Sequence, residues 1–207
     1  MGMNVEVSAI QRERRTAILD TMTRIRAVVP ESGVDRRTLD SIRAALVDLA
    51  SRAELFSRER FPPPPDPKLD SNMYQLCFDG SETLALYASV APAGLVTPPH
   101  YHGTWAVIAG VRGIEENQLY RRDPNGSLAP TRIVLVQKGT AIGMLADDVH
   151  SIRIVPTAEP FFSLHLYGLP FERTQREYRD TTTGEWCRYA ARPNVRRFHL
   201  GPEHEAG

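Results

Sequence analysis

The sequence predicts an all-β core, either a closed barrel or a sandwich, covered by N-terminal α-helices. Residues 1–60 carry two amphipathic helical patterns, whereas residues 73–170 consist of short β-rich runs separated by turn residues. Seven or so short strands at this spacing are typical of such all-β folds. With 207 residues, we expect one domain. A proline-rich connector (61–72) would join the helices to the strands, and an irregular tail (171–207) would wrap the barrel.

The two helices are predicted from apolar residues at helical spacing. The first runs from Val5 to Val29, among arginines, and Pro30 stops the pattern. The second follows Ser32-Gly-Val-Asp35, which resembles a capping box, and extends to about Ser57. Its apolar positions are Leu39, Ile42, Leu46, Leu49 and Phe56. Both patterns are typical of helices that cover a core.

The connector contains FPPPPDP, from Phe61 to Pro67. Consecutive prolines exclude a helix or a central strand and favour polyproline II. We interpret this segment as a stiff connector, with an SH3-type ligand as the alternative. The strands predicted beyond it are MYQLCF, TLALYASV, TWAVIAGV, NQLYRR, TRIVLVQ, SIRIV and FFSLHLYG, with turns at Asp79-Gly80 and Asp123-Pro-Asn-Gly126.

Composition excludes several classes of function. The 25 basic and 25 acidic residues cancel, so bulk charge favours neither nucleic acid nor an anionic membrane as a partner. Cys77 and Cys187 are far apart and form no CxxC motif, which fits a reducing compartment. No run is long and apolar enough for a membrane span or a signal peptide. We expect a soluble, cytoplasmic protein, monomeric by default.

The stretch TPPHYHGTWAVIAG places two histidines one residue apart. Alternate side chains of a strand share a face, so His100 and His102 can aim both imidazoles at one point while Tyr101 faces away. This arrangement can present two ligands to a metal. A pair of satisfied surface histidines is the alternative.

Two spaced patterns support the metal hypothesis. Gly94, His100, His102, Ala106 and Gly113 reproduce the spacing of the first cupin motif, except that its glutamate is missing at Ala106. Gly139, Leu145 and His150 reproduce the spacing of the second motif, although Leu145 and Asp147 stand where that motif has proline and glycine. The chain thus resembles the cupins, whose fold is a double-stranded β-helix barrel, and the resemblance implies a metal held by His100, His102 and His150.

The missing glutamate narrows the choice of metal. Three neutral imidazoles leave the charge of a divalent ion unbalanced and up to three coordination positions open, which favours an anionic ligand. Open positions on one face suit Fe(II) that binds both a substrate and dioxygen. Zinc with three histidines and a water is the alternative.

A third cluster, Ser163-Leu-His165-Leu-Tyr167, alternates polar with apolar residues. On a strand the serine, histidine and tyrosine share one face and the two leucines pack behind. Buried polar atoms need partners, and these three can satisfy one another while the Tyr167 hydroxyl lies near the metal. A core network without a catalytic role is the alternative.

Together with His100-x-His102 and His150, the stretch SLHLYG resembles the cysteine dioxygenase family, over roughly residues 70 to 170. These cupin thiol dioxygenases add both atoms of dioxygen to a thiol and form a sulfinate. The resemblance implies Fe(II) on the three histidines, with Ser163, His165 and Tyr167 as an outer relay. In the animal enzymes a cysteine crosslinks to the tyrosine; here that position is Ala106, so we expect Tyr167 to be an ordinary phenol.

The substrate residues differ from those of the animal enzymes. Those enzymes hold the substrate carboxylate with an arginine on an early strand. The residue of this sequence that best matches that arginine is Gln75. This resembles the bacterial glutamine-type branch, associated with 3-mercaptopropionate, in which an arginine nine residues after the tyrosine binds the carboxylate. That spacing leads to Arg176, with Arg173 close enough to compete. No acidic partner for a substrate amine is evident near Gln75 or Arg176, which favours 3-mercaptopropionate over cysteine.

Other functions stay open at this stage. L-Cysteine, cysteamine or mercaptosuccinate could be the thiol. A cupin isomerase usually keeps the glutamate that is absent at Ala106, and neither an isomerase nor a dioxygenase that cleaves C–C bonds explains the Ser163-His165-Tyr167 series. A non-enzymatic metal-binding cupin is the remaining class; the neutral chain has no appended DNA-binding helix-turn-helix.

Overall fold

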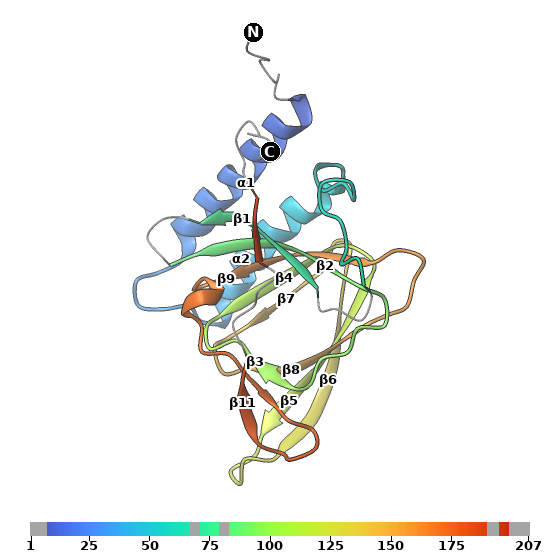
Figure 1. Ribbon diagram of the computed structural model, residues 1–207. Coiled ribbons are helices and arrows are strands. Elements are labelled where there is room, and N and C mark those ends of the chain that lie inside the picture. Colours follow the sequence, from blue (N-terminus) through green and yellow to red (C-terminus); the bar gives the residue numbers. More distant parts are fainter. Residues whose placement is uncertain (1–7, 67–70, 79–82, 190–194, 199–207) are drawn as a thin grey trace.

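The computed structural model describes the chain except for residues 1–7, 67–70, 79–82, 190–194 and 199–207. Two helices lie on one side of two β-sheets, which enclose a common interior (Figure 1). This confirms the predicted fold, a cupin-type β-barrel with N-terminal helices packed against it. No helix among the described residues is long and apolar enough to cross a membrane.

The helices begin at side-chain caps. α1 (Ala9–Val28) starts at Ser8, which forms a capping box with Gln11. α2 (Arg36–Ser51) starts at Asp35, whose carboxylate accepts hydrogen bonds from the backbone amide and hydroxyl of Thr38. These contacts satisfy amides that have no partner within the helix.

The second helix ends earlier than the predicted limit near Ser57. After Ser51 the chain forms a short 3-10 turn, η1 (Ala53–Leu55). Arg52 leaves the helical conformation, and this change of direction buries both Leu55 and Phe56 completely. Tertiary burial therefore sets this boundary, although the apolar spacing continues beyond it.

The strands form two six-stranded sheets. The first has the order β12-β1-β2-β9-β4-β7 and the second the order β11-β10-β3-β8-β5-β6. The pairs are antiparallel except β1 with β12. Their bounds are β1 Asn72–Phe78, β2 Ala85–Ala91, β3 His100–Tyr101, β4 Ala106–Arg112, β5 Ile114–Arg122, β6 Leu128–Gln137, β7 Ala141–Met144, β8 Val149–Ile154, β9 Phe161–Tyr167, β10 Glu177–Arg179, β11 Trp186–Arg188 and β12 Val195–Arg197.

Four short strands of the described residues were not predicted: β7 is brief, and β10, β11 and β12 lie in the segment that was expected to be irregular. The strand predicted for the histidine pair is β3, which ends at Tyr101, one residue before His102. The β10–β11 hairpin extends the second sheet beside β3, while β12 adds to the free edge of β1. Strands of two to four residues are too short to show clear alternation, and they form here because an existing strand edge offers unpaired backbone groups.

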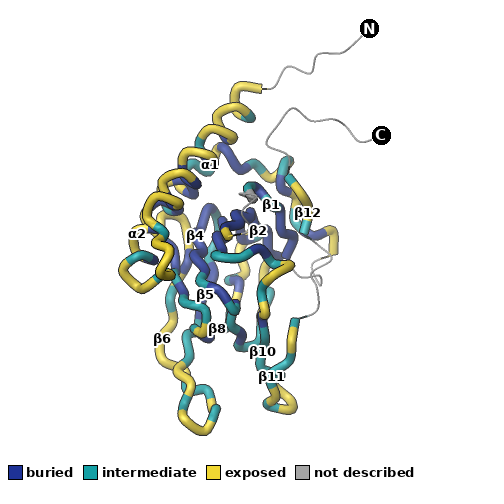
Figure 2. Tube along the Cα trace, turned by 90° about the vertical axis from the view of Figure 1, so that its left-hand side faces the viewer, coloured by how far each residue is buried: buried dark blue, intermediate teal, exposed yellow. Residues whose placement is uncertain are grey.

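The first sheet separates two apolar clusters. Its outer face packs against α1 and α2, and its inner face lines the barrel. In β9, Leu164 and Leu166 belong to the helix-side cluster, as the alternation predicted. Figure 2 shows buried segments between the helices and the strands, with exposed residues on the outer helix surface and at the hairpin tips.

The sheets meet where β4 contacts β6. A bridge joins Gly110 to Lys138, and the backbone of Gln137 lies so near that a Cβ at Gly110 would be 2.5 Å from it. Only glycine permits this approach, because any side chain would collide with backbone atoms. Gly110 therefore allows the two sheets to close on one another.

The proline-rich connector is anchored by its first residue. Phe61 is completely buried, and its ring contacts those of Phe56, Tyr74, Phe162 and Phe198. The backbone carbonyl of Pro62 accepts a hydrogen bond from the Tyr74 hydroxyl. The first residues of the connector thus pack between the helices and the barrel.

Candidate metal centre

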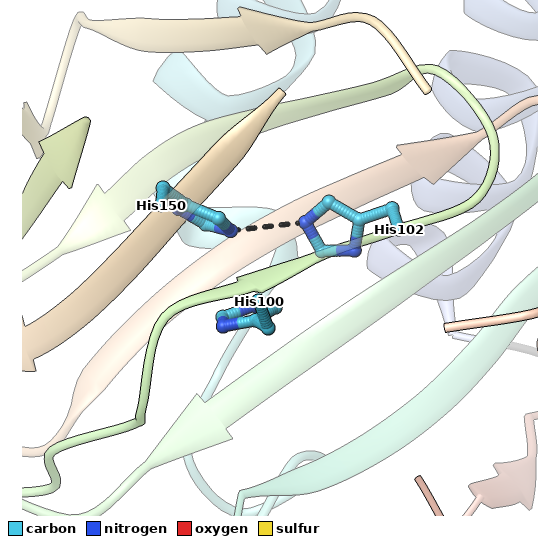
Figure 3. Close-up of side chains that lie close together, drawn as sticks. All are labelled: His100, His102 and His150. Carbon is cyan, nitrogen blue, oxygen red and sulfur yellow. Dashed lines mark hydrogen bonds between the residues drawn. The ribbon is translucent and has the colours of Figure 1, made fainter. Parts of the chain in front are cut away.

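The three predicted ligands converge inside the barrel. His100 begins β3 and pairs with His150 of β8, while His102 follows β3 directly. Each residue offers a nitrogen that lies within 4.8 Å of those of the others, and all three side chains are buried (Figure 3). This confirms the prediction that histidines from separate segments form one group, and it excludes the interpretation as surface histidines.

The spacing of two of these nitrogens fits a shared metal ion. His102 Nε2 lies 3.1 Å from His150 Nε2 (Figure 3). Two nitrogens about 2.0–2.1 Å from one ion, at angles between a right angle and the tetrahedral angle, are about 2.8–3.4 Å apart. Imidazole is a common ligand of zinc, copper, iron and nickel. The residues present therefore fit a transition-metal ion, and the donor set leaves iron and zinc open.

Burial keeps two of the ligands neutral. It is the largest cause that holds the pKa of His102 well below its usual 6.5, followed by the neighbouring His150 and His100. Burial likewise holds the pKa of His150 well below 6.5, with His100 as the next cause. A neutral imidazole has a free lone pair, so these rings can bind a metal at neutral pH without first losing a proton.

The second nitrogen of each ring has a different environment. His100 Nδ1 lies 3.0 Å from the backbone carbonyl of Pro98, and His150 Nδ1 lies 2.8 Å from Asn117 Oδ1. Both acceptors favour a proton on Nδ1, which places the lone pair that can bind a metal on Nε2. Among the described residues, the buried His102 Nδ1 has no hydrogen-bond partner.

The polar residues of β9 form a continuous row. Ser163 Oγ lies 2.8 Å from His165 Nε2, and His165 Nδ1 lies 2.9 Å from the Tyr167 hydroxyl. All three side chains are buried, and the Tyr167 ring centroid is 5.2 Å from that of His102. The structure thus places the row beside the three histidines, with the phenol nearest to them.

Position 106 lies beside this phenol. Ala106 and Tyr167 are paired residues of the β4–β9 ladder. The first cupin motif has its glutamate at this position, so its absence leaves only a methyl group at the point where the two strands meet. The two cysteines of the chain lie in other parts of the fold: Cys77 packs against the helix-side cluster and Cys187 lies in β11.

One cavity joins the histidines to an arginine. It is lined by His100, His102, His165, Tyr167 and Arg176, among others. The Arg176 side chain is buried, and its guanidinium lies 4.8 Å from the ring centroid of Phe171 and 4.7 Å from that of Tyr189. Stacking between two rings fixes the plane of the guanidinium.

The other two predicted substrate residues lie elsewhere. Arg173 is exposed, in the 3-10 turn η2 (Phe171–Arg173), and does not line the cavity. Gln75 does not line it either; its side chain hydrogen-bonds the hydroxyl of the buried Tyr87. Of the two candidate arginines, the cavity therefore contains Arg176. Substrate contact by Gln75 remains a prediction.

Sequence reasoning missed three residues of this region. Glu115 lines the cavity, Asn117 is completely buried beside His150, and Tyr189 stacks on Arg176. The strand predicted at NQLYRR begins at Ile114, before both Glu115 and Asn117. Extending that strand back to the preceding glycine would have placed these two side chains on one face. Tyr189 carried no such signal.

No protein-family model matches the sequence. Solved structures with similar coordinates include a pro-11S globulin of pumpkin (16% identity, 46% of this chain and 23% of the globulin, TM-score 0.37). Another is an oxalate decarboxylase variant from Bacillus subtilis (21% identity, 43% of this chain and 22% of the decarboxylase, TM-score 0.35). A third is the DMSP lyase DddQ from Ruegeria pomeroyi DSS-3 (20% identity, 63% of this chain and 60% of the lyase, TM-score 0.42). The chain covers less than a quarter of that globulin. These weak likenesses say nothing of a substrate or a reaction.

Proposed function

We propose that the chain is a non-haem Fe(II) thiol dioxygenase of the cysteine dioxygenase type. It would add both atoms of O2 to a small thiol carboxylate, with 3-mercaptopropionate favoured, and release a sulfinate. The observation that carries the proposal is that one cavity is bordered by two of the three histidines, His100 and His102, by His165 and Tyr167 of the β9 row, and by Arg176. A metal site alone would require neither the row nor the arginine.

Both oxygen atoms end on sulfur, so the reaction from thiol to sulfinate needs no further reductant. Fe(II) held by His100, His102 and His150 would supply the redox chemistry that joins sulfur to oxygen. Because all three ligands are neutral, the site favours an anionic thiolate. The absence of a carboxylate among these ligands thus supports a substrate that binds as an anion.

Arg176 is the group proposed to hold the substrate carboxylate. A guanidinium can form two parallel hydrogen bonds with a carboxylate, and burial strengthens such contacts. The ring contacts with Phe171 and Tyr189 would keep its donors in one plane. Substrate orientation would then depend on two fixed points, the metal for sulfur and Arg176 for the carboxylate.

The row on β9 is proposed to orient the Tyr167 hydroxyl. If the Ser163 hydroxyl donates to His165 Nε2, then His165 Nδ1 carries the proton and donates to the tyrosine oxygen. The Tyr167 proton would then point away from His165, and the hydroxyl could donate it to oxygen on the reacting group. Ser163 and His165 would therefore act as positioning residues for Tyr167.

L-Cysteine is the second candidate substrate, and one residue favours it. The preference for 3-mercaptopropionate depended on the lack of an acidic partner for an amine, yet Glu115 lines the cavity. A carboxylate there offers a partner for a substrate ammonium group. The remaining alternative, a metal-binding cupin without enzymatic activity, explains neither Arg176 nor the β9 row.

The proposal is tested with the Fe(II)-loaded protein and a panel of thiols. Oxygen uptake and sulfinate formation would be measured together with 3-mercaptopropionate, L-cysteine, cysteamine and mercaptosuccinate. Oxygen uptake with formation of an equal amount of sulfinate supports the proposal. The thiol that reacts fastest shows whether the chain belongs with the 3-mercaptopropionate or the L-cysteine enzymes. A metal-loaded protein that consumes no oxygen with any of these thiols would overturn it and leave the non-enzymatic alternative.

A further inference from the structure

A buried carboxylate stands behind one of the metal ligands. Glu115 is 2% exposed and Asn117 is completely buried, on the inward face of β5. Asn117 Nδ2 donates to Glu115 Oε1 at 2.8 Å, and Asn117 Oδ1 lies 2.8 Å from His150 Nδ1. Two hydrogen bonds thus connect the carboxylate to the imidazole.

The register of the sheet creates this connection. Leu119 of β5 is opposite His150 of β8, and Asn117 is opposite Ile152, so Asn117 reaches His150 diagonally. The next inward position along β5 is Glu115. Among the described residues, the metal-binding group contains the three histidines and no carboxylate, so Glu115 is not a direct ligand.

The connection has a direction because an amide has a donor end and an acceptor end. A carboxylate oxygen accepts, so it draws the Asn117 nitrogen toward itself. The amide oxygen then faces His150, where it can only accept, and the imidazole proton must be on Nδ1. This leaves a lone pair on Nε2, the atom that faces His102 at 3.1 Å. The carboxylate therefore selects the tautomer that can bind a metal.

His100 and His150 differ in how the tautomer is chosen. A backbone carbonyl, that of Pro98, faces Nδ1 of His100 and can only accept. At His150 an amide side chain takes that place, and an amide can rotate to present either end. The hydrogen bond from Asn117 Nδ2 to Glu115 fixes the orientation of the amide. The tautomer of His150 therefore depends on Glu115, whereas that of His100 depends on a backbone carbonyl.

We propose that Glu115 is a positioning residue for the metal centre, acting through Asn117 on His150. The ligand set itself has no carboxylate, because Ala106 stands at the position of the motif glutamate. Glu115 supplies a negative charge behind His150 instead, through Asn117. The carboxylate both orients the ligand and raises its basicity, as outer carboxylates do for other metal-bound histidines. This inference concerns metal binding, so it can hold even if the proposed reaction is wrong.

Glu115→Gln tests the proposal, because glutamine keeps the size of the side chain but removes the charge and can donate to Asn117. The matched control is Glu116→Gln, the same change on the adjacent position, where the carboxylate contacts Arg153 on the outer surface. The affinity of each metal-free protein for Co(II), which does not oxidise readily in air, would be measured by competition with a chelator. We expect affinity to fall about 10- to 100-fold in Glu115→Gln and to stay unchanged in Glu116→Gln.

The tautomer provides a second readout that requires neither metal nor substrate. Nitrogen-15 NMR of labelled imidazoles distinguishes a proton on Nδ1 from one on Nε2. At a pH well above 7, where Glu115 is ionised in the metal-free protein, we expect the His150 proton on Nδ1 in the wild type and a larger share on Nε2 in Glu115→Gln. Thermal unfolding of the metal-free variant would check that it is folded.

Co(II) affinity and the His150 tautomer together distinguish the possible outcomes. Weaker Co(II) binding together with a shifted tautomer supports the proposal. Unchanged affinity, or a loss of affinity with no change of tautomer, overturns it. A variant whose KM rises for L-cysteine while Co(II) affinity stays at the wild-type value would show instead that Glu115 contacts the substrate amine.

Discussion

Ala106 and Tyr167 are direct partners across the β4–β9 ladder. A methyl group therefore lies where the animal cysteine dioxygenases, by the resemblance described above, carry the cysteine that crosslinks to the tyrosine. The Tyr167 hydroxyl lies 2.9 Å from His165 Nδ1, and we expect Tyr167 to be an ordinary phenol. The intact mass of the active protein should accordingly equal the mass of the sequence, with no thioether formed.

Removing this hydroxyl should impair the reaction without unfolding the chain. In Tyr167→Phe the ring contacts with Tyr87 and Phe171 remain, so we expect a normal metal content. The rate of sulfinate formation should fall about 100-fold or more, because a positioned proton donor is lost. Tyr120→Phe is the control, because the Tyr120 hydroxyl hydrogen-bonds Ser151 Oγ and does not line the cavity. Equal rates for the two variants would exclude a role for Tyr167.

Metal binding should stabilise the folded protein. At a free Fe(II) concentration 100-fold above the dissociation constant, the free energy of unfolding should rise by about 2.7 kcal/mol. Anaerobic thermal unfolding with and without Fe(II) measures this. His150→Ala should abolish the shift, whereas His165→Asn should retain it because His165 belongs to the β9 row. The reverse pattern would mean that the ligands are assigned wrongly.

Arg176 should determine affinity for the substrate carboxylate. In Arg176→Met, we expect KM for 3-mercaptopropionate to rise about 10- to 100-fold, as for the loss of a hydrogen bond to a charged group. Cysteamine, which has no carboxylate, should show little change in KM. The matched variant Arg173→Met should behave as the wild type because that side chain is exposed. Steady-state kinetics would decide, and a larger effect at Arg173 would reverse the assignment.

The stability of the metal-free protein should depend on Glu115. Burial raises the pKa of Glu115 from 4.5 to about 7, although the hydrogen bond from Asn117 lowers it. The folded chain therefore holds this proton after the unfolded chain has released it. Between about pH 4.5 and pH 7 the contribution of Glu115 to the free energy of unfolding should decrease by about 3 kcal/mol, and then level off.

Denaturant unfolding of the metal-free protein across this pH range measures the effect. Glu115→Gln should lack the decrease, so its stability relative to wild type should rise with pH. Glu116→Gln should follow the wild-type curve, because its carboxylate is on the outer surface. Parallel curves for wild type and Glu115→Gln would show that the Glu115 carboxyl ionises normally.

The connector should depend on Phe61. Phe61→Ala removes a completely buried ring from a cluster of four other aromatic side chains, so the free energy of unfolding should fall by about 3–5 kcal/mol. Ile133→Ala, on the exposed surface of β6, should change it by less than about 0.5 kcal/mol. Chemical denaturation would compare the two. A change below about 1 kcal/mol in Phe61→Ala would mean that the connector is not anchored there.

The sequence by itself determined the features that depend on local periodicity. Alternate residues of a strand share a face, so His100 with His102, and Ser163 with His165 and Tyr167, could be grouped before any fold was known. Helical spacing likewise identified α1 and α2, because each buries one apolar side.

The cupin spacings already grouped His150 with His100 and His102, but only the tertiary structure decided which other segments meet at this site. The spacing after Tyr167 left two arginines, of which Arg176 lines the cavity and Arg173 does not. The contact of Glu115 with His150 through Asn117 depends on the β5–β8 register, and the three strands after residue 170 depend on edges formed by other strands. Strand register and barrel closure arise from packing over the whole chain, and the pattern within one segment does not contain them.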